Sequence, residues 1–436
     1  EMMKKVLVLG LGAQGSAAAK LLDKDPGVSE IVCADYDIKA VDGLVSELTK
    51  AKGVQVDANN VDSIVAAAEG CDLILNALAL TFTKNVLDAA LIVKADYQDY
   101  NGTDKLFREW DACELSKEYA LPDLTDTTLE WWKSYMLMFE VYAPKFEEIG
   151  KLAIFGTGSA PGTICAASKL AVRYLDTCDT IYNFVWEGAY AKRFQPFWWS
   201  PITAMYDMSD PAVALEGGKI IETEPFSRPI TRKYDYMDRV ITFREHCHDE
   251  PFQYAFNADT HFKGVKNAYF KYAGAGMDFA SQLFPAGLLS HEEEEYQGQK
   301  IIPFDYIMSH IPPAPHFKED IQEFIDEGLA LDAGCMVIEA YGQKDGVDKL
   351  IEVHVYAPGF VESFERSGIT SEMYLTGQSG YLFSKLFING DLEGQSGLIS
   401  SDMLGDEQID RFFEYAAELD ITTEVKIKDP GEVCEK

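Results

Sequence analysis

The stretch that decides the fold is Lys4-Lys5-Val6-Leu7-Val8-Leu9-Gly10-Leu11-Gly12-Ala13-Gln14-Gly15, followed at once by the small, helix-prone run Ser16–Leu22. Continuous apolar residues before the glycines are typical of a buried parallel strand. A strand, a glycine-rich turn and a helix in this order place a helix N-terminus where a pyrophosphate can bind. The first glycine permits the tight turn, the second lets the backbone approach the phosphates, and the third lets the helix pack close to the strand. The expected cofactor contacts in this loop are Gly10, Gly12, Ala13, Gln14 and Gly15.

The end of the second predicted strand indicates whether NAD or NADP is preferred. Ile31–Ala34 ends at Asp35, about twenty residues after the last glycine of the loop, with Tyr36 beside it. An acid at this place binds the ribose hydroxyls of the adenosine half and repels a 2′-phosphate. No Lys or Arg follows before Lys39. The pattern favours NAD as the cofactor over NADP.

Strands and helices continue to alternate up to about residue 100. Asp72–Ala77 and Asp96–Tyr100 are predicted strands with helical segments between them. This alternation predicts a doubly wound parallel sheet, in which ligands bind beyond the carboxyl ends of the strands. Residues at or beyond these ends are therefore further expected cofactor contacts: Asp57, Asn76, Ala77, Leu78 and Pro161, the last in a glycine-rich turn before another helix.

Sequence patterns in the rest of the chain predict a second domain with a different architecture. Segment 118–148 is aromatic-rich and reads as a helical insertion, and short β-prone runs begin near Thr180. Gln343-Lys344-Asp345-Gly346 between two such runs predicts a hairpin. We expect an α/β Rossmann domain over 1–165, a substrate-binding and dimerisation domain of α+β type with a mainly antiparallel sheet over 166–370, and C-terminal helices over 371–436 that return to the first domain.

Composition narrows the function classes. The net charge of −34 over 436 residues argues against a nucleic-acid surface, because neutralising phosphates requires Lys and Arg. No stretch approaches the ~20 apolar residues of a membrane span. The eight cysteines lack CxxC spacing and are expected to be reduced thiols of a cytoplasmic protein. His246-Cys247-His248-Asp249 places two imidazoles on one strand face, but no second ligand pair accompanies it, so we expect no metal.

Several of these stretches together resemble the saccharopine dehydrogenase-like family, and most closely its lysine 6-dehydrogenase branch. The likeness rests on Val6–Gly15, Ala34-Asp35, Asn76-Ala77, Asp99 and Ala160-Pro161-Gly162, with Phe197-Trp198-Trp199-Ser200-Pro201 ahead of Gly218-Lys219. Two features depart from the family pattern: the segment 118–148, and Glu187-Gly188-Ala189 where members often carry paired glycines. By analogy with the family we expect a homodimer.

The resemblance implies hydride transfer between a nicotinamide and a carbon that bears an amine. Such chemistry requires a neutral amine, a carboxylate beside the developing iminium and a cationic group for a substrate carboxylate. The expected catalytic residues are Asp99, at a strand end on the ligand edge, and Glu187, at the end of the first strand of the second domain. Helix capping for Asp99 and plain solvation for Glu187 are the structural alternatives. The expected substrate-binding residues are Tyr100, Arg193, Trp199 and Ser200, with surface placement the alternative for Arg193.

The sequence leaves three functions open. The first is NAD-dependent oxidation of a diamino acid such as lysine through an imine. The second is an opine-type reductase that joins an amine to a carbonyl compound. The third is a dinucleotide sensor without turnover.

Overall fold

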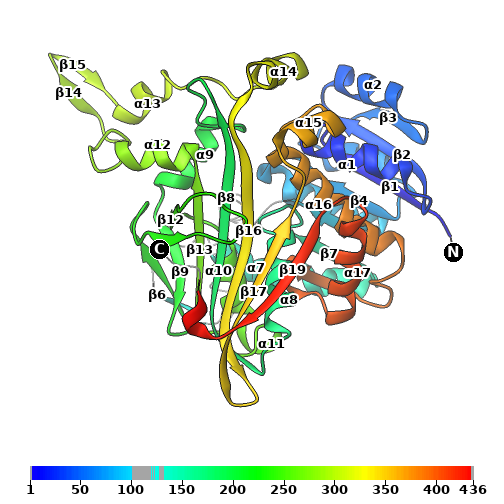
Figure 1. Ribbon diagram of the computed structural model, residues 1–436. Helices are drawn as coiled ribbons and strands as arrows, with labels where there is room; N and C mark the ends of the chain where they lie inside the picture. The colour runs from blue at the N-terminus through cyan, green and yellow to red at the C-terminus, as the bar shows by residue number, and fades with distance from the viewer. Residues whose placement is uncertain (1, 101–118, 120, 122, 127–131, 434–436) are drawn as a thin grey trace. The chain divides into compact units, whose positions relative to one another are not determined.

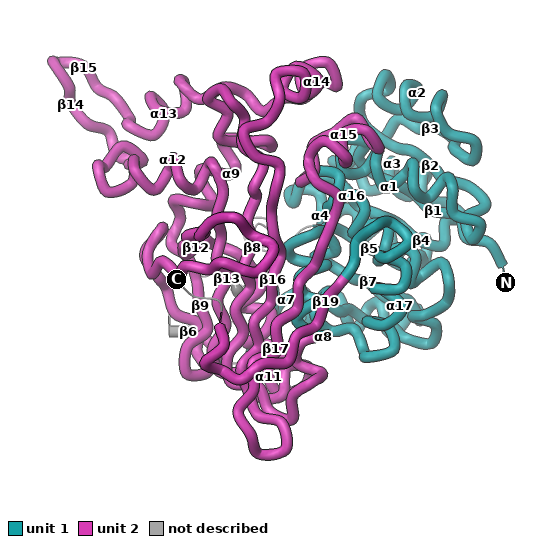
Figure 2. Tube along the Cα trace, viewed as in Figure 1, with its two compact units in different colours: residues 1–123, 127–170, 373–422 teal, residues 124–126, 171–372, 423–436 magenta. Residues whose placement is uncertain are grey.

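The computed structural model describes residues 2–100, 119, 121, 123–126 and 132–433, and the chain forms two compact units (Figure 2). Unit 1 comprises residues 1–123, 127–170 and 373–422, and unit 2 comprises 124–126, 171–372 and 423–436. Each unit is built around its own sheet (Figure 1).

The sheet of unit 1 has seven strands, all parallel, in the order β18-β7-β5-β4-β1-β2-β3. The chain crosses from β1 outward to β3 and then returns to build the other half from β4, which confirms the predicted doubly wound α/β fold. The strands are β1 (Lys4–Leu9), β2 (Val28–Asp35), β3 (Ala51–Gln55), β4 (Leu73–Asn76), β5 (Asp96–Asp99), β7 (Leu152–Phe155) and β18 (Gly397–Ser400).

Helices connect these strands. Of the predicted helical insertion 118–148, residues 132–148 form helix α7 and Thr125–Asp126 form a short strand, whereas 118, 120, 122 and 127–131 lie outside the described residues. Helix α7 packs against β7 and β18, and its Tyr135 ring lies edge-on to Phe155 with centroids 5.4 Å apart. Tyr135, Tyr142 and Phe146 of this helix are buried and are therefore part of the core. The helices of this unit are α1 (Ala13–Lys24), α2 (Ile38–Glu47), α3 (Val61–Ala68), α4 (Thr83–Val93), α7 (Trp132–Glu148), α8 (Thr163–Val172), α16 (Ser371–Ile388) and α17 (Asp406–Ala417), with 3₁₀ turns at Leu80–Phe82 and Ser401–Met403. The last two residues of α8 and the first two of α16, which include Glu372, belong to unit 2.

The main sheet of unit 2 runs β19-β17-β16-β8-β13-β9-β10-β6, with β12 paired to β13 and β11 to β12. Strands β8 and β13 pair in parallel, as do β10 and β6, whereas the ladders of β16 with β8 and β17, of β9 with β10 and of β12 with β13 are antiparallel. The expectation of a mainly antiparallel sheet is confirmed. The strands are β6 (Thr125–Asp126), β8 (Thr177–Ala191), β9 (Ala212–Glu216), β10 (Lys219–Thr223), β11 (Ile230–Arg232), β12 (Ile241–Glu245), β13 (Asn267–Gly274), β16 (Leu329–Lys344), β17 (Val347–Tyr356) and β19 (Thr422–Lys428).

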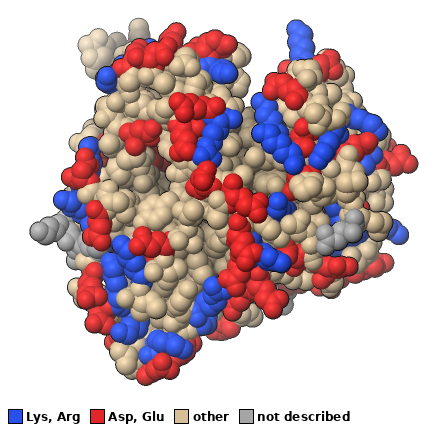
Figure 3. Space-filling view, turned by 45° about the vertical axis from the view of Figure 1, so that its right-hand side comes forward, with Lys and Arg blue, Asp and Glu red and all other residues tan. Residues whose placement is uncertain are grey.

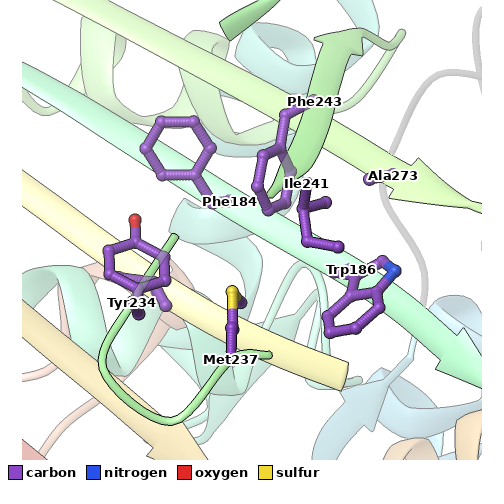
Figure 4. Close-up of a cluster of buried hydrophobic side chains, with 8 residues drawn as sticks. Phe184, Trp186, Tyr234, Met237, Ile241, Phe243 and Ala273 are labelled. Atoms are coloured by element: carbon purple, nitrogen blue, oxygen red, sulfur yellow. The ribbon is translucent and has the colours of Figure 1, made fainter. Parts of the chain in front are cut away.

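Strand β8 gives this sheet one apolar face. Phe184 and Trp186 project from it into a buried cluster with Tyr234, Met237 and Phe243 (Figure 4). Because successive side chains of a strand point to opposite faces, Glu187 lies on the other side of the same strand. The apolar cluster thus fixes the strand that presents the candidate acid.

Short helices and one hairpin complete unit 2. They are α9 (Pro201–Ser209), α10 (Glu250–Phe256), α11 (Ala258–His261), α12 (Ala275–Leu283), α13 (Pro303–Met308), α14 (Lys318–Glu327), α15 (Phe360–Ser367), a 3₁₀ turn at Pro430–Glu432, and the two-stranded sheet of β14 (Glu294–Tyr296) and β15 (Gln299–Ile301). Among the described residues, no helix has the length and apolar character needed to cross a bilayer. Figure 3 shows patches of acidic side chains interspersed with basic ones, as expected for a chain of net charge −34.

Candidate functional site

Each of the three glycines in the first loop lies in a different steric environment. Gly10 adopts φ +95°, and a Cβ there would lie 2.9 Å from the Ala77 carbonyl carbon. A Cβ on Gly15 would lie 2.0 Å from the Gly10 carbonyl oxygen, so only glycine allows this turn to pack on its helix. A Cβ on Gly12 would meet nothing within 4 Å. Space is therefore left open at the middle glycine, where a pyrophosphate would approach.

The N-terminus of α1 suits an anion. Gly12 is its N-cap residue and offers no side-chain cap, and the first turn of α1 contains no acidic residue. Backbone N–H groups and the positive end of the helix dipole then face the open space beside Gly12. The loop fits the diphosphate of a dinucleotide.

Asp35 is joined to the glycine loop directly. Its Oδ2 accepts a hydrogen bond from the backbone N–H of Leu11 at 2.7 Å, and its Oδ1 accepts one from the N–H of Asp37 at 2.9 Å. Asp37 in turn caps α2 by accepting from the N–H of Lys39. Tyr36, next to Asp35, is 73% exposed. The second-strand acid thus holds both the glycine loop and the turn that follows β2.

The polar ends of β4 and β5 are tied to each other. Asn76 is buried; its Nδ2 donates to the Tyr97 hydroxyl at 3.0 Å, and its Oδ1 accepts from the N–H of Leu78 at 3.1 Å. Tyr97 donates to Asp99 Oδ2 at 2.8 Å, and Asp99 Oδ1 accepts from the N–H of Gly156 at 3.0 Å. Asp99 is 1% exposed. Its carboxylate therefore cross-links β5 to the end of β7, and its catalytic role stays a prediction.

The other expected cofactor residues of unit 1 lie in varied surroundings. Ala77 donates its N–H to Leu9, and Gln14 Nε2 lies 3.7 Å from the sulfur of Met373. Asp57 is exposed and accepts from the N–H of Asn59 at 3.0 Å, and Pro161 is buried just before α8. Their contact with a cofactor stays a prediction.

In unit 2, Glu187 lies among buried polar groups. Its carboxylate accepts a hydrogen bond from the Tyr272 hydroxyl of the adjacent strand β13. Burial raises the pKa of Glu187 to about 7, while hydrogen bonding from Tyr272, the charge of His248 and hydrogen bonding from Trp199 oppose the rise. Trp199 and Glu187, both expected from sequence to bind or act on substrate, thus lie together.

A second carboxylate, Glu372, shares this environment. Burial and the neighbouring charge of Glu187 raise the pKa of Glu372 to about 8. Its buried Oε2 has no hydrogen-bond partner in the described part of the chain. Two carboxyl groups held together in this way are suited to binding a cation, because a cation offsets both their repulsion and their desolvation.

Two histidines adjoin the acids. The His246 ring lies 4.9 Å from that of Tyr272 and 5.6 Å from that of His248. Burial lowers the pKa of His246 to about 3, whereas Glu250, bonded to the Nδ1 of His248, is the main group that raises the pKa of His248 to about 9 against the cost of burial. No group of His, Cys, Asp and Glu able to hold a metal ion occurs among the described residues.

Three other expected substrate contacts have structural partners. Arg193 is an exposed residue whose guanidinium lies over the Phe324 ring and 3.3 Å from Glu327, so the structure favours the surface alternative. Ser200 caps α9. The Tyr100 ring is buried in unit 1, where a Cβ on Gly380 would meet it at 2.2 Å. These contacts do not exclude substrate binding, but they explain the residues without it.

Sequence reasoning missed Tyr272, Glu250 and Glu372 and did not use His248 as a site residue. Tyr272 joins Glu187 through the parallel pairing of β8 with β13, where Val185 lies beside Tyr272. No local pattern signals that pairing. The motif His246-Cys247-His248 is recognisable in the sequence. The orientation and charge of His248 depend on its hydrogen bond with Glu250, two residues further along the chain.

Comparison with known proteins identifies the dinucleotide module. Residues 6–133 match the family described as the saccharopine dehydrogenase NADP binding domain. The chain is similar to carboxyaminopropylagmatine dehydrogenase of Synechocystis, with 24% identity over 404 residues that cover 89% of this chain and 90% of the relative. It is also similar to carboxynorspermidine synthase of Vibrio alginolyticus, with 24% identity over 229 residues, 49% of this chain and 50% of the relative.

A solved structure confirms the fold. Apo saccharopine dehydrogenase (L-Glu forming) from Saccharomyces cerevisiae superposes with a TM-score of 0.66 at 14% identity, covering 97% of this chain and 99% of that chain. At this identity the likeness concerns the fold alone.

Proposed function

We propose that this protein is a nicotinamide-dinucleotide-dependent oxidoreductase acting on a C–N bond of an amino acid or polyamine, because residues 6–133 match the family described as the saccharopine dehydrogenase NADP binding domain. The observation that carries the proposal is the glycine loop: Gly10 and Gly15 are sterically required, Gly12 leaves open space, and Asp35 holds the loop from β2. A dinucleotide bound there would donate or accept a hydride.

Unit 2 would supply the amine site. Glu187 and Glu372 bind an ammonium or guanidinium group as a cation, and Tyr272 fixes the Glu187 carboxylate by its hydrogen bond. Glu187, with its pKa raised to about 7, can also take the proton that an amine must lose before it reacts. Trp199 donates to the same carboxylate and offers an aromatic wall to a cation.

We favour the coupling reaction over simple oxidation of an amino acid such as lysine. The relative that matches 89% of this chain is named for carboxyaminopropylagmatine and another for carboxynorspermidine, and both names describe a polyamine that carries a carboxyl group. In the coupling direction, the amine and a carbonyl compound form a C=N bond and release water. Hydride from the reduced cofactor and one proton from solvent or Glu187 then give the secondary amine.

Absorbance at 340 nm distinguishes the candidates. We expect NADH or NADPH to be oxidised only when a diamine or polyamine and a carboxylated aldehyde are supplied together, with the secondary amine found by mass spectrometry. Reduction of the oxidised cofactor by lysine alone would support the oxidation of a diamino acid instead. Cofactor binding without absorbance change for any pair would support a sensor and contradict the proposal.

For the cofactor we propose a preference for NAD(H), although the family description names NADP. Support comes from the negative charge at the end of β2, where Asp35 and Asp37 precede the first lysine, Lys39. A 2′-phosphate brought near these carboxylates would be repelled.

Asp35→Arg tests this preference. We expect the ratio of Kd for NADPH to Kd for NADH to fall by at least about tenfold, because a repulsive charge becomes an attractive one. Loss of the Leu11 hydrogen bond will weaken both cofactors, so the ratio measured by fluorescence titration is the decisive quantity. Asp62→Arg, at an exposed position of α3 in the same unit, is the matched control. An unchanged ratio in Asp35→Arg would remove Asp35 from the specificity site.

A further inference from the structure

The segment between β12 and α10 carries a histidine that is locked in place. The Nδ1 of His248 is hydrogen-bonded to Glu250, and its ring stacks on Phe270 at 4.0 Å between centroids with 9° between planes. Its side chain is 22% exposed, whereas that of Glu250 is fully buried. A histidine restrained by an acid and an aromatic face keeps one orientation, with part of its ring still accessible.

Several segments around His248 contribute charged or polar groups. Glu250 lies on α10, Asp249 precedes it, Asp207 comes from α9, and the neutral ring of His246 is 5.6 Å away. These acids, with Glu250 the nearest, favour the protonated ring and raise the pKa of His248 to about 9. His248 therefore carries a positive charge at neutral pH.

The geometry brings that charge close to the candidate amine site. His248 stacks on Phe270, and Tyr272, two residues further along β13 and so on the same face, donates to Glu187. The His246 ring lies between them, 5.6 Å from His248 and 4.9 Å from Tyr272. Glu187 faces Tyr272 from β13, Trp199 from the segment before α9, Glu372 from α16 and His248 from the segment after β12. Among these groups, His248 is the one that brings a positive charge. Without it, burial would leave Glu187 in its neutral form over more of the physiological range.

We propose that His248, locked by Glu250 and Phe270, is a positioning residue that holds a positive charge beside Glu187 and so keeps that carboxylate ionised for binding an amine cation. The inference rests on the proposed amine site in unit 2. The role explains why Glu250 is fully buried: its partner is the imidazolium, and the pair is neutral as a unit. His248 acts through Glu187 and is not assigned contact with the reacting atoms.

The test is the pH profile of kcat/KM for the amine. In the wild type we expect an acidic limb with a midpoint near 7, because the carboxylate form of Glu187 is lost as the pH falls through its pKa of about 7. Removing the His248 charge raises the pKa of Glu187 further, so His248→Gln should move this midpoint up by about one pH unit and lower kcat/KM at neutral pH roughly fivefold. At about pH 9 the two proteins should nearly agree.

Two variants separate charge from structure. His248→Lys retains a cation and should restore the midpoint toward that of the wild type. His246→Gln removes a neighbouring neutral ring and should leave the midpoint in place, whatever its effect on the overall rate. Equal midpoints in wild type and His248→Gln would overturn the inference, as would equal shifts in the His246 and His248 variants.

A second readout does not need turnover. Nuclear magnetic resonance titration of ¹³C-labelled glutamate carboxyls should show Glu187, assigned by its absence in Glu187→Gln, titrating at higher pH in His248→Gln than in the wild type. If no amine reacts but this shift is seen, the proposed function fails and the positioning role stands. If turnover is found and the titration does not move, the positioning role fails alone.

Discussion

Glu187→Gln is expected to lower kcat/KM for the amine by about 10²- to 10³-fold at about pH 8, while the Kd for the dinucleotide stays within about twofold of the wild type. The substitution keeps the size of the side chain and an oxygen that can accept from Tyr272. It removes the charge that a buried ammonium or guanidinium group needs, and losing one member of a buried charge pair costs about 2–5 kcal/mol. Initial rates at 340 nm over a range of amine concentrations give the value.

Glu365→Gln on α15 is the matched control, because Glu365 is exposed in the same unit. It should react as the wild type does. Equal kcat/KM values for the Glu187 and Glu365 variants would show that the Glu187 carboxylate does not bind the amine. The assignment of unit 2 as the substrate unit would then lose its main residue.

Gly12→Val should separate cofactor binding from folding. The φ of Gly12 is −65°, and a Cβ there meets nothing within 4 Å, so the free protein should keep its melting temperature within about 2 °C. The added side chain occupies the space in which the diphosphate would lie, so the Kd for the dinucleotide should rise about 100-fold or more. Thermal melts with and without cofactor measure both quantities, because bound cofactor raises the melting temperature.

Gly15→Ala is expected to behave in the opposite way. Its Cβ would lie 2.0 Å from the Gly10 carbonyl oxygen, so helix α1 must move away from the turn and the free protein should melt several degrees lower. If Gly12→Val bound the dinucleotide as tightly as the wild type does, the open space at Gly12 would not be the phosphate site.

Much of the fold of unit 1 could be predicted, because short stretches of neighbouring residues determine its backbone. The turn requires glycine at positions 10 and 15, and both glycines are recognisable in the loop sequence. The parallel sheet follows from strands that alternate with helices. The hairpin at residues 343–346 was equally local: Lys344 pairs with Val347, and Asp345 and Gly346 have φ of +52° and +74°. Where a few neighbouring residues determine the backbone, sequence is sufficient.

The site in unit 2 depends on contacts between distant residues. Glu187 and Tyr272 are 85 residues apart and meet only because β8 and β13 pair in parallel, and Glu372 comes from the start of α16. No local sequence pattern around Glu187 predicts that Tyr272 and Glu372 lie beside it. Glu187 was recognised as a candidate because it ends an apolar run, but its environment came from the fold.

Polar residues at strand ends were the hardest to interpret. Asp99 stands on the expected edge of the sheet, yet its oxygens accept from Tyr97 and Gly156. Arg193 was a reasonable partner for a carboxylate, and Glu327 on α14 provides one. A single sequence shows the chemistry that a side chain can perform, whereas its partners decide which part of that chemistry is already used.

Calorimetric titration of the 436-residue chain with NADH and NADPH is the decisive test of dinucleotide binding at the glycine loop. We expect one site per chain, a micromolar or tighter Kd for at least one of the two nucleotides, and loss of that heat in Gly12→Val. Absence of binding heat and of any rise in melting temperature with either nucleotide, in a protein that is folded by circular dichroism, would contradict it.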